Sequence, residues 1–157
     1  MPTLASSPSN QTRKAILFGG LLAGIFDLTF ACIYYGSTLG VMKSVAGGLL
    51  GGAAASQGGI LTALLGVLLH FLIAFIWAGL FWIASRRMTF LISYAVPAGL
   101  VYGLVVFYGM NSVVLPLSAL RTKAWPPSLE PLPIAMHMLT VGLPIALVAR
   151  NFSRVNS

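Results

Sequence analysis

Four polar side chains lie within long apolar stretches of this chain, and their types make them the candidates for chemistry: Asp27, His70, Asn111 and His137. Asp27 is the only acidic residue before Glu130, and it lies in the middle of the apolar stretch 15–35. That stretch is close to the roughly 20 residues that a helix needs to cross a bilayer. Because a carboxylate at mid-membrane costs about 2.5 kcal/mol or more, Asp27 requires a proton, a partner or a function that uses it.

The depths of these side chains can be compared from the rise of about 1.5 Å per helical residue. Asp27 is about half-way through its span, and His70 is about 15 Å from the outer end of the next one. Consecutive spans are usually neighbours, so we expect Asp27 and His70 to pair. Asn111 is near the outer end of a third span, and His137 is roughly 7–8 Å inside a fourth. Together they predict a polar track for a proton, an ion or a small solute, with Asp27 as the proton acceptor or cation ligand.

Two other interpretations use the same side chains. They could form only a hydrogen-bond cluster that fixes helix packing, since such bonds in lipid average about 0.6 kcal/mol. Alternatively, His70 and His137 could be axial ligands of a haem or bind a metal ion. Their estimated depths differ by about 7 Å, which disfavours a flat macrocycle. The chain has no Cys-x-x-Cys-His or His-Glu-x-x-His motif and no marked nucleophile, so we expect no catalytic residue, metal or cofactor.

The elements that must position these residues follow from composition. The 157 residues are 58% hydrophobic and only 7% charged, whereas soluble domains carry roughly 25% charged residues. The apolar stretches are long and continuous, which favours helices over membrane strands. We therefore predict an all-α integral membrane bundle of four transmembrane helices in a lipid bilayer. The single transmembrane domain covers 13–150, between a disordered tail, 1–12, and a short tail, 151–157. The four predicted spans are about 15–35, 60–84, 90–116 and 132–149.

The connection 36–59 is too polar for a confident span and too apolar for an ordinary loop. Apolar side chains recur in it at helical spacing, at Val41, Met42, Val45, Leu49 and Ala53. This pattern predicts a short interfacial or re-entrant helix after the first span.

The basic residues indicate an orientation. With the N-terminal end inside, the inner side would hold Arg13, Lys14, Arg86, Arg87, Arg150 and Arg154, and the outer side Lys43, Arg121 and Lys123. The positive-inside rule then places both ends of the chain in the cytoplasm. The bases are scattered between apolar stretches without forming one basic face, so we expect no nucleic-acid partner.

Two glycine pairs place small residues on one helix face each: Gly20 with Gly24, and Gly99 with Gly103. Such faces let helix backbones approach closely in lipid. They predict packing within the bundle, or else contact with a second copy or a membrane partner. The second case would describe a structural or assembly protein, which is the main alternative to a transport or permeation role.

Several segments resemble a group of small uncharacterised bacterial inner-membrane proteins that is loosely similar to the YagU-like family. They are LLAGIFD (21–27), SVAGGLLG (44–51), LHFLIAF (69–75), VLPLS (114–118) and GLPIA (142–146). The resemblance implies a four-helix protein of the bacterial inner membrane with no settled reaction. A small transport, permeation or stress-related component is consistent with it.

Overall fold

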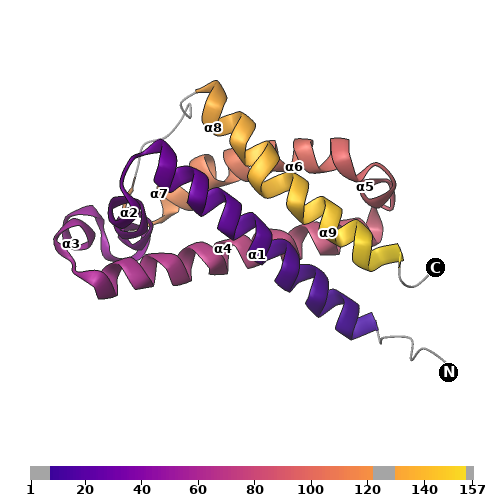
Figure 1. Ribbon diagram of the computed structural model, residues 1–157, viewed down its shortest axis with the longest axis horizontal. Coiled ribbons are helices and arrows are strands. Elements are labelled where there is room, and N and C mark those ends of the chain that lie inside the picture. The colour runs from indigo at the N-terminus through magenta and orange to yellow at the C-terminus, as the bar shows by residue number, and fades with distance from the viewer. Residues whose placement is uncertain (1–7, 122–129, 155–157) are drawn as a thin grey trace.

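The computed structural model describes residues 8–121 and 130–154, and this part of the chain is helical throughout apart from short turns (Figure 1). Within these residues 4 helices are long and apolar enough to cross a membrane: Asn10–Tyr34, Ile60–Arg87, Ala95–Leu117 and Pro131–Ser153. A shorter apolar helix, Thr38–Leu50, follows the first of them. The predicted all-α architecture with an additional short helix is therefore confirmed, and the chain is a multi-pass membrane protein by the length and composition of its helices.

The elements follow one another without strands in the described residues. The first half consists of α1 (Pro8–Tyr34), α2 (Thr38–Leu50), α3 (Gly52–Gln57) and α4 (Ile60–Arg87). The third span begins after the short α5 (Phe90–Ser93) and is made of α6 (Ala95–Gly109), the π-helical η1 (Met110–Val114) and α7 (Leu115–Leu117). The fourth span is made of α8 (Pro131–Met136), the π-helical η2 (His137–Gly142) and α9 (Leu143–Arg154).

Prolines explain why the third and fourth spans are interrupted. A proline removes one backbone donor, and its ring collides with the carbonyl four residues earlier. For Pro97 that carbonyl belongs to Ser93, where α5 ends, so the continuous span begins at Ala95 and not at residue 90 as predicted. Pro116 and Pro144 each follow a π-helical segment, η1 and η2, in which the turn widens just before the ring.

Glycines allow the spans to pack closely along two interfaces. The α1 helix crosses α4 (Figure 1). At this crossing, the Phe75 side chain fills the space at Gly20 and the Phe71 side chain fills the space at Gly24. On the other interface a Cβ atom at Gly99 would lie 2.9 Å from the Leu143 Cα atom. Gly103 likewise abuts the backbone of η2. All four glycines selected from the sequence therefore lie in contacts between helices of this same chain.

The α4 and α6 helices meet through large side chains. The Tyr102 hydroxyl donates to the Trp77 carbonyl oxygen at 2.6 Å, and the Trp77 indole donates to the Met110 sulfur at 3.4 Å. The rings of Phe81 and Tyr102 are 4.9 Å apart. Small and apolar side chains fill the interior from here toward the Arg86 end, including Ala95 and Ala146 at 0% exposure. This half of the bundle is a closed core.

One face of α4 is exposed and entirely apolar. Its exposed large side chains are Ile60, Leu61, Leu64, Leu68, Leu72, Ile76, Leu80 and Ile83. From Leu61 onward they recur three or four residues apart, so they form a stripe along one side of the helix. An apolar stripe of this length has no favourable contact with water, and in a membrane it faces the acyl chains.

The α2 helix lies across the bundle. In Figure 1 it is seen nearly end-on, whereas α4 and α6 run across the picture. The Ser37 hydroxyl caps it by accepting from the Gly40 amide at 3.1 Å, and the Met42 carbonyl packs against Gly66 of α4. Its buried residues are Val41, Ala46 and Gly47. Leu49, which is also on the predicted apolar face, is 61% exposed. Ala53 belongs to α3, because the chain turns at Gly51 with φ 84°.

The N-terminal end differs from the prediction of a disordered segment through residue 12. Helix α1 begins at Pro8, a residue that the first turn of a helix accepts readily, and residues 1–7 lie outside the described residues. Gln11 is 3% exposed, and the Trp82 indole donates to the Thr12 hydroxyl at 3.1 Å. These contacts with the core hold the first turns of α1 in place. Lys123 and the end of the 151–157 tail also lie outside the described part of the chain.

Candidate functional site: a polar cavity between the four spans

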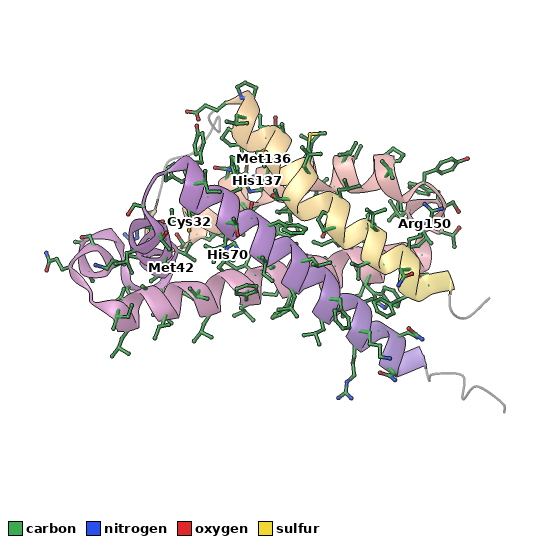
Figure 2. The ribbon with its side chains drawn as sticks, viewed as in Figure 1. Cys32, Met42, His70, Met136, His137 and Arg150 are labelled. Atoms are coloured by element: carbon green, nitrogen blue, oxygen red, sulfur yellow. The ribbon has the colours of Figure 1, made fainter. Side chains whose placement is uncertain are left out.

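A cavity of about 770 Å³ lies at the end of the bundle where α1 ends and α8 begins. Its lining includes Asp27 from α1, His70 from α4, Asn111 from η1 and His137 from η2. The structure therefore brings all four side chains selected from the sequence to one cavity, one from each span. Figure 2 shows His70 and His137 in the half of the bundle near α2 and α8.

The mouth of this cavity carries polar side chains that the sequence analysis did not select. The Tyr34 hydroxyl donates to the Glu130 carboxylate at 3.0 Å, and Ser44 of α2 also lines the wall. Tyr34 follows Asp27 by two helical turns, so both side chains are on one face of α1. That spacing, and the fact that Glu130 is the only other acid in the chain, were the signals for this group.

A smaller cavity of about 90 Å³ continues from the same residues toward the centre of the bundle. It shares Asp27, His70 and His137 with the larger cavity and ends against Trp77. Apart from these three its lining is apolar, and the closed core lies beyond it. The polar space thus reaches from one end of the bundle to about its middle.

The predicted Asp27–His70 pair is not formed in the part of the chain that the structure describes. The His70 Nε2 atom instead lies 3.0 Å from the Gly24 carbonyl oxygen, one turn before Asp27 on the same helix. The reason is the close packing at Gly24, where a Cβ atom would lie 2.7 Å from the Phe71 ring. With the α1 backbone this near, its carbonyl oxygen is within reach of the imidazole.

Asp27 is half-buried, and its hydrogen-bond partner in the described chain is Thr140 of η2. The Thr140 hydroxyl oxygen lies 3.4 Å from Asp27 Oδ1 and 2.7 Å from the Met136 carbonyl oxygen. A threonine hydroxyl has one proton to donate, and the shorter contact with a carbonyl oxygen takes it. Asp27 is therefore weakly held, and Thr140, which is 8% exposed, was missed from the sequence.

The two imidazoles are held through different ring nitrogens. The His137 Nδ1 atom lies 2.9 Å from the Pro133 carbonyl oxygen, and its ring packs edge-on against Phe107 at 5.3 Å. A carbonyl oxygen only accepts, so the proton of neutral His137 is on Nδ1 and that of neutral His70 is on Nε2. Within the described residues, the other nitrogen of each ring is an acceptor without a hydrogen-bond partner.

Asn111 is bonded within its own helix. Its amide donates to the Phe107 carbonyl oxygen at 2.9 Å, at the point where the chain enters the π-helical turn of η1. Its amide oxygen remains available as an acceptor. The predicted track is therefore a set of side chains around one space, and among the described residues these four side chains make no direct hydrogen bond with one another.

The side chains of this cavity can accept protons and hydrogen bonds. The site offers a carboxyl group, two imidazole nitrogens and an amide oxygen. No group of three or more His, Cys, Asp or Glu side chains within the described residues is placed to hold a metal ion. Cys32 is a free, half-buried thiol of α1 that lines neither of the two cavities.

Comparison with known proteins identified no protein related to this chain. No family model, no curated protein and no solved structure matches this chain. The resemblance to YagU-like proteins therefore stays a prediction.

Proposed function

We propose that this protein is a small transport or permeation component that takes up protons or small cations from the Glu130 end and binds them at Asp27. One observation carries the proposal: the 770 Å³ cavity gathers one polar side chain from each of the four spans. Intramembrane ionisable side chains that face the interior of a bundle mark ion and proton pathways.

The charges around the cavity support a cationic occupant. The chain has only two acids, Asp27 and Glu130, and both line this cavity. No Lys or Arg of the described residues lines it, although the chain carries nine of them. A cleft lined by charges of one sign between low-dielectric walls concentrates ions of the opposite sign. The cavity therefore attracts cations and repels anions.

The hydrogen bonds around Asp27 support a proton as that cation. Since the proton of Thr140 is committed to Met136, a charged Asp27 gains little from the Thr140 oxygen. A protonated Asp27 would itself donate to that oxygen and satisfy its own hydroxyl. His70 and His137 each keep a free acceptor nitrogen, and imidazoles of this kind pass protons readily. The proposed order is from Glu130 to the two imidazoles and then to Asp27.

Passage beyond Asp27 requires a change of conformation. The inner cavity ends against Trp77, and Phe81, Ala95 and Ala146 close the core toward the Arg86 end. The two π-helical segments η1 and η2 carry Asn111 and His137, and short π segments in helices are frequent at functional sites. We place the movement that alternately opens the site at these two segments.

The glycine faces do not favour the alternative role as an assembly protein. Gly20 and Gly24 are filled by Phe75 and Phe71, and Gly99 and Gly103 abut the fourth span. Faces used within the chain are not free for a second copy. An assembly role would have to use other surfaces.

Orientation and location belong to the same proposal. Arg13, Lys14, Arg86, Arg87 and Arg150 lie at one end of the bundle, and Lys43 and Arg121 lie at the other among the described residues. The positive-inside rule favours the Arg86 end as cytoplasmic, with the Glu130 mouth outside. A bacterial inner membrane is the location that the resemblance implies.

The function is tested by flux in proteoliposomes with the wild-type chain. Vesicles with an internal pH-sensitive dye receive a potassium gradient and valinomycin, so that a membrane potential drives proton entry. We expect proton flux well above that of protein-free vesicles, and the same preparation assayed for sodium uptake separates the two cations. Fluxes of both ions equal to those of protein-free vesicles would overturn the proposed function.

A further inference from the structure

A second polar pocket lies at the opposite end of the bundle from the Glu130 mouth. It has a volume of about 250 Å³ and is lined by Ser85, Arg86, Thr89, Ile92, Ser93 and Ser153. Five of these six side chains are polar, and they come from the end of α4, the turn that contains α5, and the end of α9. Liquid water occupies about 30 Å³ per molecule, so the pocket has room for a group of several heavy atoms.

The guanidinium of Arg86 is held in position at this pocket. It stacks over the Trp82 ring at 4.2 Å from the ring centre, and it donates to the Ser153 hydroxyl. The Ser153 hydroxyl in turn donates to the Ala149 carbonyl oxygen at 2.7 Å. A guanidinium has five N–H donors, so most of them remain for a ligand. Two partners that fix the side chain reduce the entropy that ligand binding would cost.

The other groups at the pocket also favour a ligand that only accepts hydrogen bonds. The Thr89 hydroxyl makes no hydrogen bond in the described chain, and the Ser93 hydroxyl has only a 3.4 Å contact with the Thr89 carbonyl oxygen. Arg150, one turn before Ser153 on α9, has a buried Nε atom without a hydrogen-bond partner among the described residues. Figure 2 shows Arg150 on the side of α9 toward α5. Arg150 does not line the pocket, so the Thr89 and Ser93 hydroxyls are the donors that supplement Arg86 there.

The charge at this end is uncompensated. Both acids of the chain line the other cavity, so Arg13, Lys14, Arg86, Arg87 and Arg150 have no side-chain carboxylate near them. The planar guanidinium group of arginine presents N–H donors in a geometry that matches the oxygen atoms of phosphate. Basic pockets between membrane helices bind the anionic headgroups of lipids. We propose that this pocket binds a phosphate group, held by Arg86 with Thr89 and Ser93, at the surface of the membrane.

Two sources share this chemistry: the headgroup of an anionic phospholipid and free phosphate. Native mass spectrometry of the full chain in detergent separates them. One titration uses phosphatidylglycerol, a second uses diacylglycerol with the same acyl chains, which has no phosphate, and a third uses inorganic phosphate alone. Retention of phosphatidylglycerol over diacylglycerol identifies a lipid source, and binding of inorganic phosphate alone identifies the free ion. Equal retention of both lipids without phosphate binding would overturn the proposal.

Substitutions test whether the retained ligand binds in this pocket. Arg86→Gln should weaken binding of the retained ligand about tenfold, since a charge-assisted hydrogen bond to phosphate is lost. Arg87→Gln is the matched control, because it removes the same charge from the neighbouring residue, which does not line the pocket. It should change binding by less than about twofold. The pair Thr89→Val and Ser93→Ala tests the hydroxyls without touching Arg86, and it should also weaken binding. Equal losses of binding in Arg86→Gln and Arg87→Gln would show that the ligand is attracted to the basic end of the bundle as a whole. That result would overturn the proposed binding in the pocket.

Discussion

The His70 ring binds the backbone of α1 at Gly24, with Nε2 3.0 Å from the carbonyl oxygen. This contact joins the first and second spans at the depth of the two cavities. It leaves Asp27 without the imidazole as a direct partner, so that both side chains face the same space. The site is therefore a cavity lined by hydrogen-bond acceptors that do not bond to one another among the described residues.

When their rings are neutral, the two histidines should adopt opposite tautomers. The chain has only 2 histidines, so the nitrogen NMR spectrum of a histidine-labelled sample contains only their signals. At a pH where both rings are neutral, we expect one ring protonated at Nε2, for His70, and the other at Nδ1, for His137. His137→Gln assigns the signals by removing one set. Two rings in the same tautomer would contradict the hydrogen bonds described above.

The Thr140 hydroxyl should be required for full proton flux, because it contacts Asp27. Thr140→Val keeps the shape of the side chain and removes the oxygen that faces Asp27, so a protonated Asp27 loses its acceptor. We expect proton flux to fall about tenfold, because an unsatisfied buried polar group costs about 1–3 kcal/mol. Thr140→Ser keeps the hydroxyl and should retain most of the flux. Equal fluxes in the two variants would show that this oxygen has no role.

The charge at the mouth of the cavity should affect the rate at which cations enter more than their binding at Asp27. Glu130→Gln removes the exposed charge that attracts cations, and we expect proton flux to fall severalfold with a steeper loss at low ionic strength. Tyr34→Phe removes only the 3.0 Å hydrogen bond to Glu130 and should change flux by less than about twofold. A salt-independent effect of Glu130→Gln would count against electrostatic attraction at the mouth.

Two glycine substitutions should differ in their effect on the stability of the bundle. A Cβ atom at Gly103 would collide with the backbone of η2 at His137 and Met138, so Gly103→Ala should destabilise the bundle by about 1–3 kcal/mol. At Gly79 the nearest atom is 3.9 Å from the added Cβ, so Gly79→Ala should be neutral or stabilise by up to about 1 kcal/mol. Thermal unfolding in detergent compares the two. A lower midpoint for both variants would show that the added methyl at Gly79 also lacks room.

The sequence predicted the four spans because the length of an apolar stretch is a local property. It did not predict the partner of His70, since that depends on how closely α1 and α4 approach at Gly24. The start of the third span was also not predicted, because Pro97 ends α5 at Ser93 and moves that start to Ala95. The recurring apolar residues predicted the short helix α2, but they did not predict that the turn at Gly51 ends it before Ala53.

The remaining members of the site were hidden for a different reason. Thr140 and Tyr34 are residue types that occur throughout membrane helices, and only the packing of η2 against α1 places Thr140 beside Asp27. Glu130 follows residues that the structure does not describe, and its contact with Tyr34 is made across 96 positions of sequence. Residue spacing indicated that Tyr34 shares a face of α1 with Asp27, but it does not predict which residue lies opposite Tyr34 at that separation.

The most direct test of the central claim compares Asp27→Asn with Thr29→Val in the proteoliposome proton-flux assay. Asp27→Asn keeps the size of the side chain and removes its ability to ionise. Thr29→Val removes a polar group from the same span at an exposed position that lines neither cavity. The account predicts that Asp27→Asn reduces proton flux to the level of protein-free vesicles, while Thr29→Val retains wild-type flux. Wild-type flux in Asp27→Asn would contradict the claim that Asp27 is the proton-binding group of this cavity.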